Sequence, residues 1–244
     1  MEVLGVDIGG SGIKGAPVNL KTGALTAQRH RISTPIPATP EAVTATLLKL
    51  VKFFNWTGPI GCGFPAVVRG GIIRTAANID KKWIGKDVFK LFKDATGCET
   101  VVLNDADAAG LAEMSFGAGK DHPGVAIIMT VGTGIGTAIL SDGHLVPNTE
   151  FGHLIMKGMI AEHYASDGVR KQEGLSWKKW SKRFNEYLYQ MEELFWPDLI
   201  IIGGGISKKE DKFFHYLETR AEIVPAQLLN NAGIIGAALA TKHF

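Results

Sequence analysis

Two glycine-rich turns decide the fold of this chain: Asp7-Ile8-Gly9-Gly10-Ser11-Gly12 and, about half a chain later, Thr130-Val131-Gly132-Thr133-Gly134-Ile135-Gly136. Each turn follows an apolar run, Val3–Val6 for the first and Val125–Met129 for the second. A strand that ends in a tight glycine turn brings backbone N–H groups and hydroxyls close to an anion. Two such turns predict two related halves that bind one phosphorylated substrate, and the acidic Asp7 favours a metal-bridged phosphate.

The composition is that of an ordinary globular protein. Of 244 residues, 45% are hydrophobic and 20% are charged, and the formal net charge is +2, which is too small to indicate a nucleic-acid or membrane partner. No apolar run has the length of a membrane span, and the chain begins directly with a strand pattern instead of a signal peptide, so we expect a cytoplasmic protein. Cys62 and Cys98 lie in apolar surroundings, which predicts buried free thiols and excludes a cysteine-rich zinc site.

Hydrophobic periodicity predicts strands that alternate with helices, which is the α/β class. Strands are expected at 3–8, 13–19, 24–32, 60–64, 101–103, 125–130, 135–140, 144–146 and 198–202, with a hairpin at 67–73. Helices are expected at 41–54, from 104 onward, and at 177–195, 211–217 and 231–240. The strand–turn–strand start of both halves is unlike a Rossmann unit.

The common nucleotide-binding motifs are absent. Gly10 to Gly15 has the Walker A spacing, but Ala16 and Pro17 follow where lysine and serine or threonine are needed. The dinucleotide pattern fails at Lys208, which stands where the third glycine after Gly203 and Gly205 should be.

An ordered set of motifs resembles the ROK family (repressors, open reading frames and kinases), a sugar-kinase branch of the actin-like ATPase superfamily. The resemblance covers nearly the whole chain and rests on Asp7–Gly12, Gly63-Phe64-Pro65, Asn78, Asn104-Asp105, Thr130–Gly136, Glu150-Phe151-Gly152-His153, Glu162-His163-Tyr164-Ala165-Ser166 and Gly203-Gly204-Gly205. Within the family, the chain is most similar to the polyphosphate-using glucokinases, with which it shares the lack of a cysteine-rich zinc segment after His153.

The resemblance implies a duplicated, ribonuclease-H-like fold of two domains around a cleft. Residues 1–112 would form a smaller N-terminal α/β domain, and 113–231 a larger C-terminal one. The C-terminal helix, at about 232–244, would pack back on the first domain.

The resemblance makes Asp105 the general base, because phosphorylation of a sugar hydroxyl requires a carboxylate that accepts its proton. Without the resemblance, a helix cap is the better interpretation of Asp105, since Asn and Asp favour such positions. Asp107 is a nearby competitor for the role of base.

The resemblance also predicts the glucose-binding residues, which with Asp105 itself are Gly63, Pro65, Asn78, Asn104, Glu150, His153 and Glu162. Glu150 and His153 are three residues apart, so they face one way only if the local backbone is turn-like or helical. A purely structural histidine is the alternative for His153, and a loop cap for Asn78. Ala66 and Thr149 stand where the family usually has glycine, which puts the sugar specificity in question.

The predicted phosphate-binding residues are Asp7, Gly9, Gly10, Ser11, Gly12, Lys14, Thr130, Gly132, Thr133, Gly134, Gly204, Gly205, Lys208 and Lys209. A divalent ion, Mg²⁺, is expected to bridge phosphate oxygens, with Asp7 as its ligand directly or through water. A plain hairpin is the alternative for either turn taken alone.

The phosphoryl donor is the open question. Inorganic polyphosphate needs a track of basic residues instead of an adenine pocket. The candidates are Lys178, Lys179, Lys182 and Arg183 on one helix, and Lys208, Lys209 and Lys212 after the triple glycine. The first set could equally be a solvated helix face, and Gly203–Gly205 could seat the adenosine of ATP.

These observations predict a phosphotransferase that makes glucose 6-phosphate from glucose and inorganic polyphosphate. The alternatives are an ATP-dependent hexose kinase, dual use of ATP, a sugar-sensing repressor of the same family, and a sugar-binding protein without activity. The resemblance also suggests a homodimer.

Overall fold

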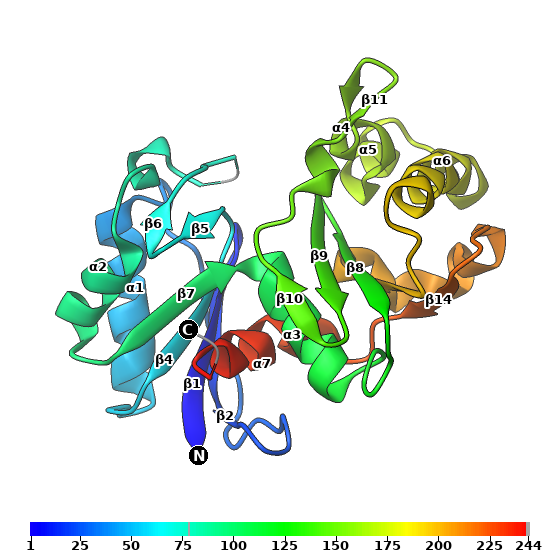
Figure 1. Ribbon diagram of the computed structural model, residues 1–244. Coiled ribbons are helices and arrows are strands. Elements are labelled where there is room, and N and C mark those ends of the chain that lie inside the picture. Colours follow the sequence, from blue (N-terminus) through cyan, green and yellow to red (C-terminus); the bar gives the residue numbers. More distant parts are fainter. Residues whose placement is uncertain (78, 243–244) are drawn as a thin grey trace. The chain divides into compact units, whose positions relative to one another are not determined.

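The computed structural model describes residues 1–77 and 79–242, and the chain divides into two compact units. Unit 1 contains Met1–Ala112 and the C-terminal segment from Asn231, and unit 2 contains Glu113–Asn230. The boundary therefore lies inside helix α3 (Asp105–Phe116). Each unit is built around its own five-stranded sheet, as Figure 1 shows.

The two sheets have the same strand order and the same strand directions. The order in unit 1 is β3-β2-β1-β4-β7, with β1 (Glu2–Ile8), β2 (Ile13–Asn19), β3 (His30–Ile32), β4 (Ile60–Phe64) and β7 (Thr100–Asn104). The order in unit 2 is β10-β9-β8-β13-β14, with β8 (Val125–Val131), β9 (Ile135–Ser141), β10 (His144–Val146), β13 (Leu199–Gly203) and β14 (Glu222–Pro225). In each sheet the first three strands are antiparallel neighbours and the last three are parallel. This repeated topology confirms the predicted duplicated α/β fold.

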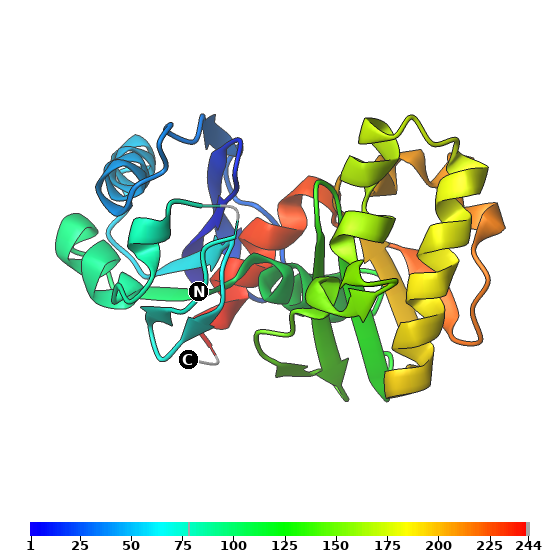
Figure 2. The ribbon, with the colours of Figure 1, turned by 90° about the horizontal axis from the view of Figure 1, so that it is seen from above.

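In unit 1, the pleat of β1 sends alternate residues to opposite faces of the sheet. Leu4, Val6 and Ile8 join the apolar core under α1 (Pro40–Phe53) and α2 (Val88–Thr96). On the other face, an added Cβ at Gly5 would overlap the backbone carbonyl of Ile234 in α7 (Ala232–Ala240). Figures 1 and 2 show α1 and α2 on one side of this sheet and α7 on the other.

The same close packing occurs on β4, where an added Cβ at Gly61 would overlap the carbonyl of Ala237. Gly5 and Gly61 are paired in register, so both glycines lie under α7. Because neither residue has a side chain, α7 packs directly against the backbone of the sheet.

In unit 2, the core lies between the sheet and the long helix α6 (Trp177–Phe195). The Ser176 hydroxyl caps this helix by accepting the Lys179 N–H, and Trp196 ends it in the left-handed conformation with φ of 44°. Trp180, Phe184 and Tyr187 pack from α6 into the core. Two short helices, α4 (Glu162–Ala165) and α5 (Asp167–Gln172), precede α6.

Two sequence predictions of local structure are corrected, and one helix was not predicted. The strand expected at 24–32 is limited to β3, because Leu25 forms only an isolated bridge to Val18 and residues 26–27 bend. The helix expected at 211–217 consists of 3-10 segments, Gly204–Lys212 and Phe214–Tyr216. Helix α2 was not predicted, although Asp87 caps its start and Gly97, with φ of 74°, ends it.

The remaining elements are short. They are the hairpin of β5 (Val68–Arg69) and β6 (Ile72–Ile73), the hairpin of β11 (Ile155–Met156) and β12 (Met159–Ile160), and the 3-10 turns Lys81–Trp83, Phe151–His153 and Leu229–Asn231. Cys62 and Cys98 are buried free thiols, as predicted, and burial raises the pKa of Cys62.

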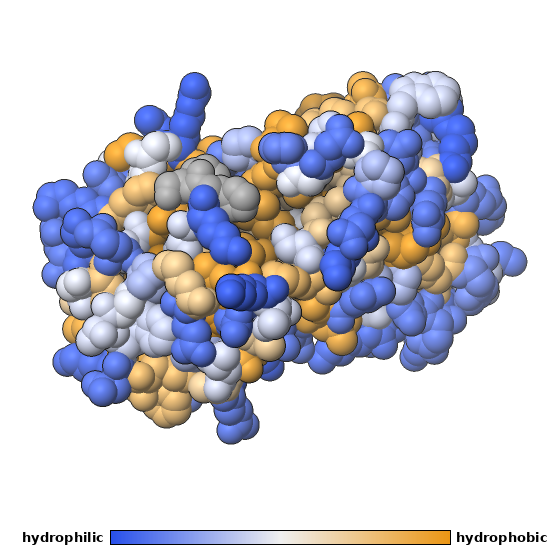
Figure 3. Space-filling model, turned by 60° about the horizontal axis from the view of Figure 1, so that its bottom comes forward, coloured by the Kyte–Doolittle hydropathy of each residue, from blue (hydrophilic) through white to orange (hydrophobic). Residues whose placement is uncertain are grey.

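Hydrophilic residues project from the face drawn in Figure 3, with apolar residues between them. Among the helices that the structure describes, none combines the length and the apolar character needed to cross a membrane.

Candidate active site

In unit 1, the predicted site residues gather at the carboxyl ends of three adjacent parallel strands. Asp7 of β1 pairs in register with Gly63 of β4, which in turn pairs with Leu103 of β7. Asp105 follows directly, as the first residue of α3. Ligands of parallel α/β sheets bind at this edge, because the strand ends and the loops that follow them meet there.

The first glycine turn connects β1 to β2. Its backbone is closed by a hydrogen bond from the Gly9 N–H to the Gly12 carbonyl, at 3.1 Å. The hydroxyl of Thr34 donates to the Gly9 carbonyl at 2.5 Å, so the loop that follows β3 also holds the turn in place. The carbonyls of Gly9 and Gly12 therefore accept hydrogen bonds from within the protein. A turn that offers its N–H groups to an anion needs its carbonyls engaged elsewhere in this way.

Asp7 lies between a lysine and a helix start. Its Oδ2 pairs with Lys14 Nζ at 3.0 Å, and both side chains are mostly buried. A Cβ at Gly233 would lie 3.0 Å from the Asp7 carboxyl carbon, so the first turn of α7 approaches this carboxylate. Helix N-termini stabilise negative charge. The sequence predicted Lys14 as a source of charge for phosphate, but its charge is balanced by Asp7 in this structure.

Asn104 supplies the helix cap that was the alternative role for Asp105. Its Oδ1 accepts the N–H groups of Ala106 at 2.8 Å and Asp107 at 3.1 Å, and its Nδ2 donates to the Ala66 carbonyl at 3.3 Å. Asp105 is half-buried and its Oδ1 accepts the Ala106 N–H at 2.9 Å, whereas Asp107 is only 1% exposed. Asn104 thus restrains the backbone at the start of α3, which carries Asp105.

The loop after β4 is shaped by Pro65. The Ala66 N–H donates back to the Phe64 carbonyl at 2.8 Å, which makes a tight turn around the proline. Ala66 is buried, so the methyl group that replaces the family's glycine fits inside the fold. Asn78, the remaining predicted sugar ligand of unit 1, lies outside the described residues.

In unit 2, the second glycine turn lies beside the triple glycine. The turn is closed by the Gly132 N–H, which donates to the Gly134 carbonyl at 3.0 Å. Gly203 of β13 pairs in register with Thr130, and a Cβ at Gly204 would lie 2.6 Å from the backbone N and O of Val131. Gly204 also has φ of 80°, which favours glycine. Two separately predicted phosphate-binding segments are therefore in direct contact.

A buried ion cluster behind the second turn was missed by the sequence reasoning. The Gly168 N–H donates to the Gly132 carbonyl at 2.9 Å, which joins α5 to the turn. Next to Gly168, the buried Asp167 pairs with Arg170 at 2.6 Å and Lys171 at 2.7 Å. Burial opposes ionisation of Asp167, but the hydrogen bonds from Lys171 and Arg170 outweigh it and lower its pKa. An acid followed by bases three and four residues later was the available signal.

Three of the predicted sugar ligands, Glu150, His153 and Glu162, form one cluster. His153 Nδ1 lies 3.5 Å from Glu150 Oε2, and His153 Nε2 lies 3.7 Å from Glu162 Oε1. The 3-10 turn Phe151–His153 provides the helical backbone that lets Glu150 and His153 face one way. Burial raises the pKa of Glu150, and Glu162 raises it further, while His153 opposes both.

Glu162 also contacts the second glycine turn. Its Oε2 accepts the Ile135 N–H at 3.3 Å, and a Cβ at Gly134 would overlap this oxygen. The side chain is 16% exposed. Glu162, a predicted sugar ligand, is therefore hydrogen-bonded to a predicted phosphate-binding turn.

Thr149, which replaces the family's usual glycine, has a structural role. Its hydroxyl donates to the Thr137 carbonyl at 2.9 Å, and the Thr137 hydroxyl donates to the Thr149 carbonyl at 2.8 Å. The Phe151 N–H donates to the same Thr137 hydroxyl at 3.1 Å. The hydrogen bonds between Thr137 and Thr149 anchor to β9 the segment that carries Glu150 and His153.

The basic residues proposed as a donor track differ in their availability. Arg183 is paired with Glu173 through hydrogen bonds of 2.6 and 3.2 Å and lies over the Tyr164 ring. The lysines are exposed and form no ion pair with any described acid; they are Lys178, Lys179, Lys182, Lys208, Lys209 and Lys212. Lys208 and Lys209 follow the triple glycine, which contacts the second turn.

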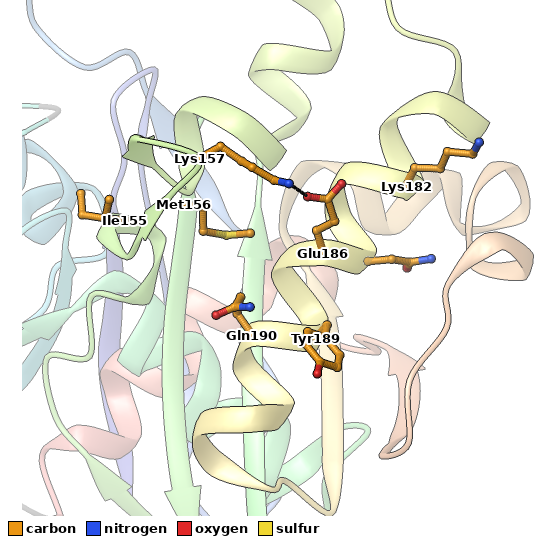
Figure 4. Close-up of a pocket in the computed structure, with 8 residues that line it drawn as sticks. Ile155, Met156, Lys157, Lys182, Glu186, Tyr189 and Gln190 are labelled. Atoms are coloured by element: carbon orange, nitrogen blue, oxygen red, sulfur yellow. Dashed lines mark ion pairs between the residues drawn. The ribbon is translucent and has the colours of Figure 1, made fainter.

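Unit 2 also contains a pocket of about 500 Å³ between the β11–β12 hairpin and α6 (Figure 4). Lys157 and Glu186 form an ion pair of 3.1 Å across it. It is lined by Ile155, Met156, Lys157, Lys182, Asn185, Glu186, Tyr189 and Gln190. Its lining includes Lys182, a candidate for the polyphosphate track, but none of the predicted glucose-binding residues and no residue of the two glycine turns.

Comparisons with known proteins agree with these motifs. The family model described as "ROK family" matches residues 3–174. The polyphosphate glucokinase of Mycobacterium tuberculosis (strain CDC 1551 / Oshkosh) is 49% identical over 97% of this chain and 90% of that protein. The solved inorganic polyphosphate/ATP-glucomannokinase of Arthrobacter sp. strain KM has a TM-score of 0.95 and 45% identity, and the match covers 99% of each chain.

A ROK-family glucokinase from Streptomyces griseus, solved with glucose and AMPPNP, has a TM-score of 0.83 over the whole of both chains. At 24% identity it supports the fold alone. The family model covers well over half of the 244 residues, and the same motifs lie at the strand ends described above. The chain therefore belongs to the ROK family.

Proposed function

We propose that this chain is a polyphosphate glucokinase, which transfers a phosphoryl group from inorganic polyphosphate to the 6-hydroxyl of glucose. The supporting observation is the edge of the unit 1 sheet, where Asp7, Gly63 and Asp105 follow one another across three parallel strands. The name of the Mycobacterium tuberculosis relative specifies this activity, and the name of the Arthrobacter protein includes the same donor.

Asp105 is the general base in this proposal. Its carboxylate accepts the proton of the 6-hydroxyl as the sugar oxygen bonds to the terminal phosphorus of the donor. The bond between that phosphorus and the bridging oxygen breaks, which releases glucose 6-phosphate and a polyphosphate one unit shorter. The Asn104 cap restrains the start of α3, so Asp105 needs little reorganisation to accept the proton.

Glu150, His153 and Glu162 are proposed to bind glucose hydroxyls. Ionised carboxylates accept hydrogen bonds from hydroxyl groups, and imidazole can donate or accept. Burial raises the pKa of Glu150 above its ordinary value. Asn104, Gly63, Pro65 and Asn78 are proposed to complete the sugar side.

Asp7 is proposed as the carboxylate ligand of Mg²⁺. Among the described residues, no group of three or more His, Cys, Asp or Glu side chains is arranged to hold a metal ion. Mg²⁺ does not require such a cage, because it usually binds through one or two carboxylates, substrate phosphates and waters. Asp7 lies beside a phosphate turn, and because its Oδ2 is paired with Lys14 Nζ at 3.0 Å, the ion would reach it through water or by displacing the lysine. The bound ion would offset negative charge on the phosphates.

The two glycine turns, with Lys208 and Lys209, are proposed to bind the donor. ATP is a second candidate donor, since Gly204 and Gly205 lie against the second turn without bulky side chains. The Arthrobacter protein is named for both donors.

The test is glucose 6-phosphate formation by the pure protein with glucose and Mg²⁺, with nucleotide-free polyphosphate and ATP in parallel. We expect turnover with polyphosphate and a fall of about 10²–10⁴-fold in kcat for Asp105→Asn, the usual contribution of a general base. Glucose affinity of this variant, measured by calorimetry, should fall much less than kcat, because the asparagine amide can still hydrogen-bond a sugar hydroxyl. Asp107→Asn is the control, because this buried carboxylate belongs to the same helix turn.

Turnover with ATP alone would refute the polyphosphate assignment. Retained activity in Asp105→Asn, or an equal loss in Asp107→Asn with an unchanged fold, would refute Asp105 as the base. The oligomeric state, expected to be a homodimer, is measured by light scattering.

A further inference from the structure

We propose that Arg31 on strand β3 is a donor-binding residue, which contacts phosphoryl oxygens held at the first glycine turn. This inference rests on the proposed function, because it assigns a ligand to the donor of that reaction. It concerns unit 1 alone, and neither the sequence motifs nor the names of the relatives point to Arg31.

The sheet register places Arg31 in a row of three charges. Asp7 of β1 is opposite Lys14 of β2, and Lys14 is opposite Arg31 of β3. Residues directly opposite each other in antiparallel strands share one face of the sheet. The side chains of Asp7, Lys14 and Arg31 therefore begin on the same face, one strand apart from each other.

The Arg31 guanidinium lies directly on the turn. One of its terminal nitrogens donates to the Ser11 carbonyl at 2.6 Å. A Cβ at Gly12 would lie only 2.5 to 2.7 Å from the guanidinium atoms. Gly12 thus leaves room for this group, and the guanidinium is held beside the backbone that the sequence predicts to bind phosphate.

Of the three charged residues in the row, Arg31 is the one whose charge is not balanced by another member. Lys14 and Asp7 neutralise each other at 3.0 Å. Among residues 1–77 and 79–242, no acid forms an ion pair with Arg31, and its side chain is exposed. A guanidinium has five N–H donors, and the bond to Ser11 uses only part of them. The remaining donors match the planar, two-point binding of phosphate oxygens.

A purely structural role is the competing explanation, since the bond to Ser11 also braces the turn. The two roles predict different kinetics. A brace would affect stability, glucose use and donor use together. Loss of a phosphate ligand would weaken donor binding selectively. It would also make the remaining binding less sensitive to salt, because the charge interaction that salt screens is gone.

The test compares wild type with Arg31→Gln, Arg31→Lys and Lys49→Gln. Lys49 is an exposed lysine on α1, and the Lys49→Gln substitution removes the same charge elsewhere in the unit. For Arg31→Gln we expect the KM for polyphosphate to rise about tenfold, as for loss of one charge-assisted hydrogen bond. Glucose KM and kcat should stay within about twofold of wild type. Arg31→Lys should be intermediate, and Lys49→Gln should resemble wild type.

A second readout is the affinity for short-chain inorganic polyphosphate without glucose, measured by calorimetry at two salt concentrations. We expect Arg31→Gln to bind more weakly and to lose less affinity as salt rises. Equal binding by Arg31→Gln and wild type would overturn the inference, as would an equal effect of Lys49→Gln. A parallel loss of thermal stability, kcat and glucose KM would also overturn it in favour of the brace.

Failure of the proposed function has a different signature. It appears as wild-type protein that makes no glucose 6-phosphate from polyphosphate, whatever residue stands at position 31. The calorimetric comparison still decides the role of Arg31 in that case, because it requires no turnover.

Discussion

Replacing Gly134 by alanine should impair the use of glucose, although Gly134 belongs to a turn assigned to the phosphoryl donor. A Cβ at Gly134 would overlap Oε2 of Glu162. The overlapping atom is the end of a flexible side chain, so the carboxylate can move while the backbone of the turn stays. The displaced Glu162 would lose the hydrogen bond from the Ile135 N–H and its place near His153.

The expected magnitude for glucose follows from one further hydrogen bond, the one that the Glu162 carboxylate is proposed to accept from a glucose hydroxyl. Hydrogen bonds to a charged group contribute about 2 kcal/mol, and Glu162 is only 16% exposed, so little solvent compensates. A loss of about 2 kcal/mol corresponds to a roughly 30-fold fall in kcat/KM for glucose. The melting temperature should fall by only a few degrees, because the internal bond from the Ile135 N–H is lost while the backbone of the turn stays in place.

Gly132→Ala is the matched control in the same turn. An added Cβ at Gly132 meets no atom within 4 Å, and its φ lies outside the left-handed region. We therefore expect nearly normal glucose kinetics for this variant. The assay is steady-state formation of glucose 6-phosphate with glucose varied at saturating donor, together with thermal denaturation of both variants.

Two results would refute the reasoning. Equal glucose kinetics in the two variants would show that Glu162 does not transmit the change. A selective rise in the donor KM of Gly134→Ala, with glucose kcat/KM unchanged, would assign Gly134 to the donor alone.

Three further predictions concern pH and packing. Because burial raises the pKa of Glu150, kcat/KM for glucose should fall on acidification at a higher pH than for an ordinary glutamate, and pH profiles of Glu150→Gln should lack this step. Burial opposes ionisation of Asp167, but hydrogen bonds from its basic neighbours lower its pKa. The ionised Asp167 therefore stabilises the fold at neutral pH, and this contribution disappears as the pH falls through the lowered pKa. Asp167→Asn should therefore lose about 2 kcal/mol at pH 7 in urea unfolding, and the difference from wild type should shrink in acid; a difference independent of pH would contradict this. Gly61→Ala should cost several kcal/mol, measured by the same unfolding, because its Cβ would overlap the Ala237 carbonyl and α7 would have to move; near-normal stability would show that α7 is loosely packed.

Much of the fold could be predicted because it follows from local signals. Apolar runs bounded by glycine turns identified most strands of both sheets, and α6 was recognised from its amphipathic pattern between Ser176 and Pro197. The short helix α2 escaped prediction, although its Asp87 cap and Gly97 end were present. Residues 211–217 looked helical from spacing, but spacing does not separate a 3-10 turn from an α-helix over so few residues.

The sequence predicted a set of site residues but not the contacts among them. Glu150, His153 and Glu162 were named from motifs, and the structure places them within one cluster. The sequence left two roles open for Asp105, a base and a cap. The structure assigns the cap to Asn104, whose Oδ1 accepts two N–H groups of α3.

The sequence by itself determined the family and the duplicated α/β plan, because these depend on motifs within short stretches of chain. From the same motifs it predicted the residues that would bind phosphate and sugar. Only the tertiary structure decided which charges are balanced and which remain available. Lys14 is neutralised by Asp7 through strand register, and Arg31 reaches Ser11 across a separation of 20 residues. Charge and hydrogen-bond partners depend on distances of a few ångströms between segments, and those distances exist only once the sheets have formed.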